Sequence, residues 1–372
     1  MSRPLHARID LAALRHNYQI ACECFPHSHA LAVVKADAYG HGAVLCAAAL
    51  EPFAPGFAVA SIEEALALRH GGIKKPIVLL EGFFSQDELP LLAMHNIWTA
   101  VHSQWQVDAI LASSLETPIS AWLKLDSGMH RLGFCVTELA ANWGRLAASG
   151  KVVNMHLMTH FATADQAKTS YLDHQLANVV AAKEVLEQDG FQVPCCLANS
   201  PATLAQRAEG AWHRPGIMLY GCNPQEEPVT ARLQPVMTLA SELIAVRDIA
   251  PGEPVGYGGR FVATRPTRIG VVACGYGDGY DRHAREGTPV LVEGKRAPIA
   301  GRVSMDMLTV DITDIPEGAV GSRVTLWGID ADTGATLEVS EVARYCDTID
   351  YTLLTGVMPR VPRHPVNLRE AD

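Results

Sequence analysis

Residues 31–42 read LAVVKADAYGHG, an apolar run that ends at Lys35 and continues into a segment bounded by glycines. An unbroken run of Leu and Val, without polar alternation, is typical of a strand buried on both faces of a parallel sheet. A lysine that closes such a strand is partly withdrawn from water, so its amine is a candidate nucleophile or Schiff-base former. The alternative is a structural lysine whose ammonium group reaches out to solvent.

Seven more runs of this kind follow, separated by segments with helical periodicity. With the first, the predicted strands span residues 31–36, 56–61, 76–82, 98–103, 119–126, 154–160, 193–200 and 214–221. Capping-box patterns at 61–64 and 85–88 and glycines at 71–72 and 190 indicate where the intervening helices begin and end. Eight strands alternating with helices predict an α/β fold with a closed (β/α)8 barrel rather than an open sheet.

The segments before and after the eight predicted strands have different sequence patterns. Beyond residue 235, short β-type runs alternate with Gly/Pro turns, and one helical stretch lies near 340–347. We therefore expect residues 1–235 to form the barrel and residues 236–372 a mostly β domain. A helix beginning after Asp10, a suitable N-cap, is expected to pack on one domain or to bridge both.

Composition excludes several classes of protein. The 372 residues are 48% hydrophobic and 19% charged, which suits a large core and not a disordered chain. A formal net charge of −10 argues against general binding to nucleic acids or membrane surfaces, since polyanions attract basic faces. The apolar stretches are too short to span a membrane, and the start of the sequence does not resemble a signal peptide.

Cysteines and glycine-rich stretches give no metal or nucleotide motif. The nine cysteines include no CxxC pair, which favours reduced thiols in a cytoplasmic protein. GYGDGY (275–280) does not match a dinucleotide-binding loop. Because no HExxH or comparable ligand spacing occurs, we predict no metal site.

Polar residues cluster at the predicted strand ends, where the active site of a (β/α)8 barrel lies. Arg131 follows the fifth strand, His160 closes the sixth and Ser200 closes the seventh. Each is also compatible with a structural hydrogen-bonding role. With Lys35 they make four polar residues at one barrel mouth, and the charged ones would be costly to bury there without a function.

The last two strand ends suggest a phosphate site. Ser200 and the amides of Gly216 and Ile217 can supply donors where barrels often bind phosphate, although helix capping and turn formation would also explain them. A lysine on one side and a phosphate cradle on the other describe a seat for pyridoxal 5'-phosphate (PLP).

A family resemblance extends over almost the whole chain. In order, it is carried by AVVKADAYGHG, SGMHRLGF, THFATAD, ANSPATL, RPGIMLYG, VGYGG, GYGDGY, GRVSMDM and RVPR. These motifs resemble those of the alanine racemases, PLP enzymes with a (β/α)8 barrel and a C-terminal β domain, including the catabolic bacterial form. The resemblance implies two-base interconversion of L- and D-alanine in a homodimer with composite active sites.

The same resemblance implies a role for each matching residue. Lys35 would bind PLP covalently and act as one base, and Tyr257 would be the other. Further cofactor contacts would come from Tyr39, His160, Asn199, Ser200, Arg214, Gly216, Ile217 and Tyr351. Arg131 and the Met305 amide would hold the substrate carboxylate, Tyr276 would narrow the entrance, and Lys124 and Asp306 would support the site. Tyr257, Tyr276 and Met305 would come from the partner subunit.

Three departures and three alternatives accompany this hypothesis. Asp37 stands where many members have Asn, Gly277 where Ala is usual and Cys196 where some have His. The alternatives are a PLP-dependent decarboxylase, which Arg214 and Tyr257 disfavour, a PLP carrier, which the long second domain disfavours, and a racemase of broader range. The sequence leaves open whether D-alanine is made or consumed, and whether Lys124 is carbamylated.

Overall fold

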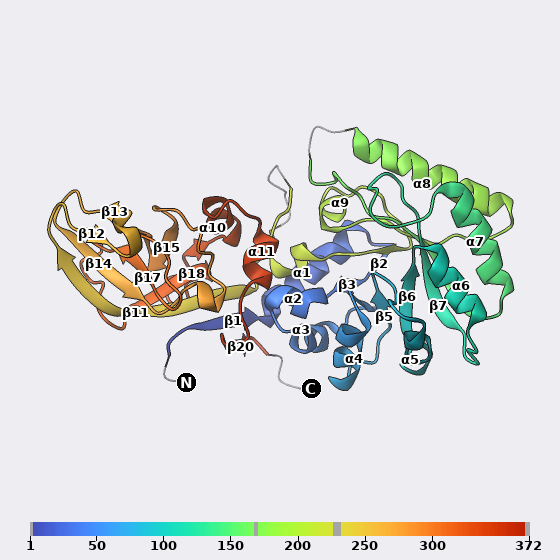
Figure 1. Cartoon of the computed structure of the whole chain (residues 1–372), viewed down its shortest axis with the longest axis horizontal. Helices are drawn as coiled ribbons and strands as arrows, with labels where there is room; N and C mark the ends of the chain where they lie inside the picture. The colour runs from blue at the N-terminus through green and yellow to red at the C-terminus, as the bar shows by residue number, and fades with distance from the viewer. Residues whose placement is uncertain (1–2, 167–169, 226–231, 369–372) are drawn as a thin grey trace.

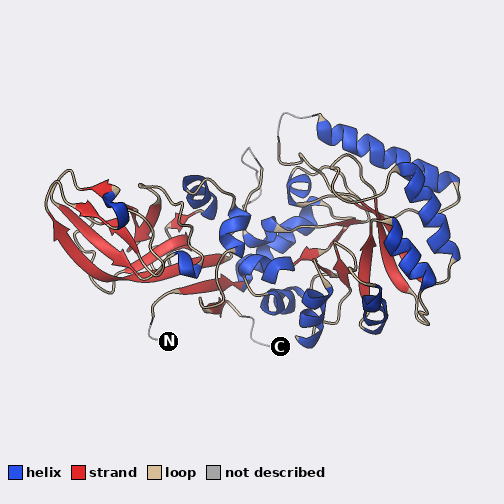
Figure 2. Cartoon of the chain, viewed as in Figure 1, coloured by secondary structure: helices blue, strands red, loops and turns tan. Residues whose placement is uncertain are grey.

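The chain folds into a parallel barrel and a β-rich domain that lie along one long axis (Figure 1). The computed structural model describes residues 3–166, 170–225 and 232–368. Helices surround the barrel, whereas strands dominate the second domain (Figure 2). The predicted fold class is therefore confirmed. We keep the division at residues 235/236 as a proposal, because β1 (His6–Asp10) pairs within the second sheet.

The barrel closes through its first strand, which is split at Leu31. Among the described residues its sheet has nine strands in the order β2-β10-β9-β8-β7-β6-β5-β4-β3. They are β2 (His29–Ala30), β3 (Ala32–Val33), β4 (Phe57–Val59), β5 (Ile77–Leu79), β6 (Ile97–Val101), β7 (Ile119–Lys124), β8 (Val152–Met158), β9 (Cys195–Cys196) and β10 (Trp212–His213). Since β2 pairs with β10 and β3 with β4, the ladder returns to where it began.

The prediction for the eighth strand was wrong. Residues 214–221 were expected to be extended, but the strand is β10 and residues Ile217–Tyr220 form the 3-10 helix η2. Pro215 has no amide hydrogen for a sheet ladder. The Gly216 amide donates to Ser200 Oγ (2.8 Å) instead of to a strand. The chain therefore leaves the sheet at this point.

Helices follow the strands around the barrel. They are α1 (Leu11–Cys24), α2 (Lys35–Gly40), α3 (Ala43–Leu50), α4 (Ile62–His70), η1 (Gln86–Glu88), α5 (Leu89–Met94), α6 (Gln104–Ala112), α7 (Val136–Ala148), α8 (Tyr171–Gln188) and α9 (Ser200–Leu204). Asp10 caps α1 as predicted, because its Oδ1 accepts from the amides of Ala12 (2.9 Å) and Ala13 (3.0 Å).

The two predicted capping boxes differ in outcome. Ser85 and Glu88 form the box at η1. Ser61 is the N-cap of α4 but makes no side-chain cap bond, so the box at 61–64 was wrong. The reason is that Glu64 turns away and accepts hydrogen bonds from the amides of Ala36 and Ala60.

The second domain is built on the long strand β11 (Met237–Ile249). Its other strands are β12 (Pro254–Val255), β13 (Phe261–Val262), β14 (Thr267–Val272), β15 (Pro289–Val292), β16 (Lys295–Pro298), β17 (Leu308–Asp311), β18 (Arg323–Ile329), β19 (Thr336–Leu337) and β20 (Arg363–Val366). Its helical elements are η3 (Tyr257–Gly259), η4 (Tyr276–Asp278), α10 (Val339–Tyr345) and α11 (Asp350–Thr355). The predicted helix near 340–347 is confirmed as α10.

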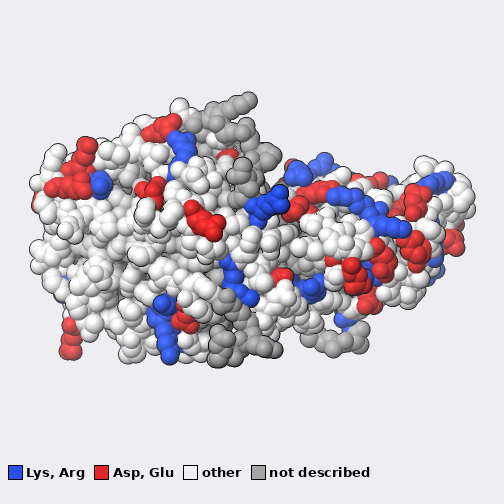
Figure 3. Space-filling model, turned by 180° about the vertical axis from the view of Figure 1, so that it is seen from behind, with Lys and Arg blue, Asp and Glu red and all other residues white. Residues whose placement is uncertain are grey.

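The N-terminal segment bridges the two domains. β1 is antiparallel to β11 and parallel to β20, while α1 packs against η2 of the barrel. Over the face seen in Figure 3, side chains of both charge signs intermix on the second domain. Within the described residues, no helix has the length and apolar character needed to cross a membrane.

Candidate functional site

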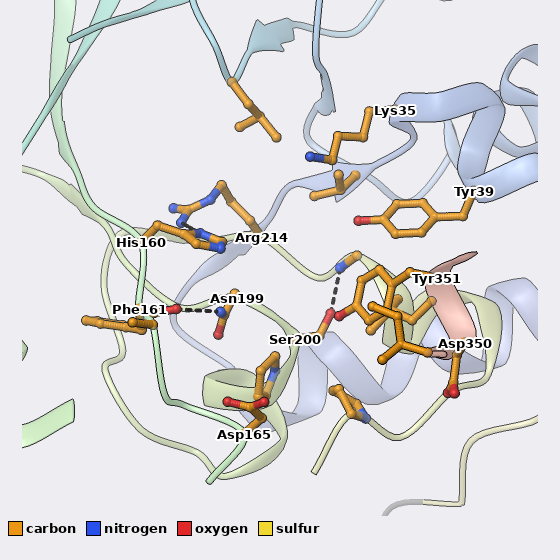
Figure 4. A pocket seen from close by; sticks show the side chains of 18 of the residues that line it. Lys35, Tyr39, His160, Phe161, Asp165, Asn199, Ser200, Arg214, Asp350 and Tyr351 are labelled. Carbon is orange, nitrogen blue, oxygen red and sulfur yellow. Dashed lines mark hydrogen bonds between the residues drawn. The ribbon is translucent and has the colours of Figure 1, made fainter. Parts of the chain in front are cut away.

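A cavity of about 1090 Å³ opens at the carboxyl ends of the barrel strands. Side chains from β3, β7, β8 and the segments after β9 and β10 line it, and α11 of the second domain closes one side. Figure 4 shows Lys35, Tyr39, Arg214, Ser200 and Tyr351 around the same space. The barrel topology thus collects in one place residues that are far apart in the sequence.

Lys35 and Tyr39 enter the cavity from a turn of unusual handedness. Lys35 lies two residues after the end of β3, and the four residues Ala36 to Tyr39 have φ between 51° and 54°. This is the left-handed region, and the four residues amount to about one turn. The Lys35 amine and the Tyr39 hydroxyl consequently point into the same space (Figure 4).

The Tyr39 hydroxyl fits only because residue 216 is glycine. A Cβ atom at Gly216 would lie 2.6 Å from the Tyr39 hydroxyl oxygen. Burial raises the pKa of Tyr39, and burial, with the nearby Tyr39, also raises the pKa of Tyr351. Both phenols are therefore protonated near neutral pH and can donate hydrogen bonds into the cavity.

Ser200 presents a further donor to the cavity. Its Oγ accepts from the amides of Gly216 (2.8 Å) and Met218 (3.4 Å). Because both bonds use the oxygen as an acceptor, the hydroxyl hydrogen is left to donate to a bound group. The adjacent Asn199 is the N-cap of α9, and its Oδ1 accepts from the Ala202 amide (3.2 Å).

Arg214 is a buried cation held by uncharged atoms. Its side chain donates to the carbonyl oxygens of Cys196 (2.8 Å) and Thr159 (2.6 Å) and contacts Cys196 Sγ (3.0 Å). With 5% of its surface exposed, its position is fixed but its charge is not balanced by these partners. A cation in this state favours an electron-rich group in front of it.

Neighbouring cations shape the protonation of the site. Burial, together with Arg214 and Arg131, lowers the pKa of Lys124 to about 8. Burial and the same two arginines, with Lys124, hold the pKa of His160 well below its ordinary value, so its ring is neutral. The cavity is therefore rich in positive charge and suited to an anionic ligand.

The structure brings most of the predicted site residues together. Those that line the cavity are Lys35, Tyr39, Lys124, Arg131, His160, Asn199, Ser200, Arg214, Gly216, Ile217 and Tyr351. Three others lie on the second domain, outside the cavity lining: Tyr257 is 72% exposed, Tyr276 38% and Met305 55%. Asp306 pairs there with Arg360 (2.7 Å).

Sequence reasoning missed three carboxylates in the cavity wall, Glu81, Asp165 and, from α11, Asp350. Glu81 closes the predicted strand 76–82, so the rule that located Lys35 at a strand end would also have found it. Asp165 lies in the loop after β8, and no local pattern singles it out. Glu81 partly offsets the positive charge around Lys124.

Comparison with known proteins assigns the chain to a family. The family model "Alanine racemase, N-terminal domain" matches residues 9–224, and "Alanine racemase, C-terminal domain" matches residues 236–365. The chain belongs to the alanine racemase family. The predicted resemblance is thus confirmed over both domains.

Relatives of known name match nearly the full chain. An alanine racemase of Chromohalobacter salexigens is 62% identical and covers 98% of both chains. A catabolic alanine racemase of Pseudomonas putida is 53% identical, covering 97% of this chain and 98% of its own. The crystal structure of the biosynthetic alanine racemase of Pseudomonas aeruginosa has a TM-score of 0.92 at 46% identity, covering 98% of this chain and 100% of its own.

Proposed function

We propose that this protein is a PLP-dependent alanine racemase that interconverts L- and D-alanine. The observation that carries the proposal is the cavity in which the Lys35 amine faces Arg214, a buried cation with uncharged hydrogen-bond partners. The family membership and the relatives named alanine racemase support the same activity.

The side chains present fit a phosphorylated pyridine aldehyde. Lys35 would bind the aldehyde carbon covalently, and the Ser200 hydroxyl with the phenols of Tyr39 and Tyr351 would donate to the phosphate. The Gly216 amide is already used by Ser200 Oγ, so it would act by orienting that hydroxyl. When bound, the cofactor delocalises the electron pair left on Cα after a proton is removed.

Arg214 favours racemisation over decarboxylation. A guanidinium cannot supply or accept a proton near neutral pH, so it would leave a pyridine nitrogen in front of it unprotonated. Its own position is fixed by the carbonyl groups of Thr159 and Cys196. A weaker electron sink would limit competing reactions of the substrate.

Two bases on opposite faces of Cα complete the mechanism. The Lys35 amine would hold or return the proton on one face, and the Tyr257 phenol oxygen on the other. Arg131, at the mouth of the cavity, would bind the alanine carboxylate with the Met305 amide. The two bases must sit on opposite sides of the same carbon atom, so they cannot both come from one wall of the cavity.

A head-to-tail homodimer would supply the second base. Tyr257, Tyr276 and Met305 are exposed on the second domain and do not line the cavity of their own chain. A two-fold arrangement that lays this surface over the partner's barrel mouth would complete both sites at once.

Nine free cysteines also favour a cytoplasmic enzyme.

Lys124 is placed to support Arg131 and is a candidate for carbamylation. Its pKa of about 8 leaves part of its amine neutral, the form that adds CO2. Arg131 and Arg214, which lower that pKa, would stabilise the resulting carbamate anion. Mass spectrometry of the native protein after exchange into ¹³C-bicarbonate tests the modification.

Deuterium exchange tests the activity. Purified protein with added PLP should incorporate solvent deuterium at Cα of L-alanine and, separately, of D-alanine, and both should converge on a racemic mixture. If PLP binds but neither alanine exchanges, the proposal that alanine is the substrate is contradicted. Release of CO2 from amino acids would identify a decarboxylase instead.

A further inference from the structure

The turn that carries Lys35 has a backbone conformation that its own residues do not favour. Ala36, Asp37, Ala38 and Tyr39 all have positive φ, between 51° and 54°. In this region the Cβ of an L-residue crowds the following carbonyl, so a run of four is seldom formed without outside contacts. Something beyond the turn must hold it.

Contacts at the far end of the turn come from several elements. The Asp37 carboxylate accepts from the Ala43 amide (2.7 Å), and His41 Nδ1 lies 2.9 Å from the carbonyl oxygens of Ala38 and Tyr39. Arg363 of the second domain donates to the Gly40 carbonyl oxygen (3.1 Å). These contacts fix the exit of the turn rather than the residue next to Lys35.

The near end of the turn is held by a carboxylate from another helix. Glu64 of α4 accepts from the Ala36 amide through Oε1 (2.7 Å) and from the Ala60 amide through Oε2 (2.7 Å). It therefore joins the first residue after Lys35 to the segment that follows β4. Hydrogen bonds to an ionised carboxylate are stronger than those between neutral groups.

Glu64 makes these contacts in place of the one its position predicts. A glutamate at the third position of a helix usually accepts from the N-cap amide, here that of Ser61. Its two oxygens instead bind the amides of Ala36 and Ala60, and Ser61 gives α4 no side-chain cap. The carboxylate thus serves the turn rather than the start of its own helix.

We propose that Glu64 is a positioning residue for the cofactor site: it holds the left-handed turn so that Lys35 and Tyr39 point into the cavity. The inference rests on the proposed function, because it takes Lys35 as the residue that binds PLP. Glu64 itself does not line the cavity and acts only through the backbone at Ala36.

The first test compares Glu64→Ala with Glu63→Ala. Glu63 is the neighbouring residue of α4, exposed and without a contact to the turn, so it is a matched control. Fluorescence titration should give about tenfold weaker PLP binding for Glu64→Ala, the loss expected for one charge-assisted hydrogen bond. Borohydride trapping should label Lys35 more slowly in proportion, whereas Glu63→Ala should match the wild type.

The second test asks whether the turn itself is what Glu64 supports. Ala36 is exposed, and glycine pays no Cβ penalty at positive φ. Adding Ala36→Gly to Glu64→Ala should therefore recover about threefold of the lost PLP affinity. Loss of a helix cap alone would not be rescued at position 36.

The outcomes separate the two proposals. A wild-type protein that does not bind PLP at Lys35 overturns the proposed function and this inference with it. A wild type that binds PLP, with unchanged binding by Glu64→Ala or no rescue by Ala36→Gly, overturns only the role of Glu64. If Glu64→Ala does not unfold cooperatively, Glu64→Gln is used in its place. A Glu64→Gln variant that equals the wild type in PLP binding and in trapping at Lys35 would overturn the positioning role of Glu64.

Discussion

The barrel mouth and the surface of the second domain around Tyr257 and Met305 both carry predicted site residues, but in opposite settings. In the barrel, Arg214 and Lys124 are 5% and 7% exposed and face a common cavity. In the second domain, Tyr257 and Met305 are 72% and 55% exposed and face no cavity of their own chain. In the proposed dimer, the barrel mouth would form one part of each active site, and the exposed surface of the partner's second domain would cover it.

The two regions also treat their charges differently. In the barrel, burial and the neighbouring cations Arg214 and Arg131 lower the pKa of Lys124. In the second domain, Asp278 is enclosed by Arg3 (2.5 Å) and Arg360 (2.7 Å). The exposed loop beside it is also tied down, since the Gly277 amide donates to the Met305 carbonyl oxygen (2.8 Å). Ion pairs and a backbone hydrogen bond therefore hold this exposed surface of the second domain in place.

Replacing Lys35 should have the largest effect. Lys35→Ala removes the amine that would bind PLP and one of the two bases, so turnover should fall by at least about 10⁴-fold. The visible absorbance of bound PLP should disappear as well. A variant that retained wild-type turnover would show that the cavity is not the site of reaction.

Replacing Tyr257 should separate binding from proton transfer. Tyr257→Ala should keep PLP bound but lower turnover about 10³-fold, because a general base is lost. Deuterium exchange should fall more for one alanine enantiomer than for the other. Tyr345→Ala, a partly exposed tyrosine of the same domain, is the control and should exchange both enantiomers normally. Equal loss for the two enantiomers would contradict the two-base assignment.

The burial of Lys124 beside other barrel cations predicts that the unfolding free energy of the protein depends on pH. Lys124 has a folded-state pKa of about 8, below the ordinary lysine value, so the folded protein binds fewer protons than the unfolded chain between the two values. Stability from this group is present above the ordinary lysine value and is lost as pH falls through about 8. Lys124→Met should therefore gain stability over the wild type as pH falls from 10 to 7.

The size of that gain follows from the shift. The gain in unfolding free energy should reach about 3 kcal/mol, because the pKa of Lys124 falls from the ordinary lysine value to about 8 on folding. Denaturant melts of cofactor-free protein in bicarbonate-free buffer at several pH values measure it. A constant difference between wild type and Lys124→Met across this range would show that burial and the neighbouring cations do not lower the pKa of Lys124.

The paired charges of the second domain predict a smaller effect: replacing Asp278 should destabilise the protein at neutral pH, whereas replacing Lys124 should stabilise it. Burial raises the pKa of Asp278, but hydrogen bonds from Arg3, the Gly275 amide and Arg360 outweigh it and leave the pKa below its usual range. Its stabilisation is present above the ordinary carboxyl value and is lost as pH falls through the lowered one.

The matching variant is Asp278→Asn. It should cost about 2 kcal/mol in unfolding free energy at pH 7, since both arginines are partly exposed. The difference from wild type should shrink below about pH 4. Asp278→Asn should also have a higher KM for alanine, with little change in its affinity for PLP. Unchanged stability at pH 7 would contradict the enclosed ion pair.

The same contrast explains what the sequence could predict. Unbroken apolar runs such as residues 77–80 predicted the barrel, because burial on both faces leaves a continuous pattern. Lys35, His160 and Ser200 were singled out because a barrel places its strand ends together. These inferences need only local patterns and one rule of topology. The role of Arg214 was predicted only from the family resemblance.

Features that depend on distant backbone were not predictable. The four residues of the left-handed turn after Lys35 include no glycine that would predict a positive φ. The hydrogen bond to its first residue comes from Glu64 of another helix. The capping box at 61–64 failed for the same reason. The eighth strand was misplaced because the Gly216 amide binds Ser200, sixteen positions away along the chain. Local patterns do not record such partners.

The central claim is that each active site combines one barrel with the second domain of the partner. Coexpression of Lys35→Ala chains with Tyr257→Ala chains tests it most directly, because each variant alone should be inactive. If the sites are shared, one of the two sites in every mixed dimer is intact, and random pairing should restore about a quarter of wild-type activity. If the purified mixed dimer is as inactive as its parents, Lys35 and Tyr257 of one chain serve the same site and the account is wrong.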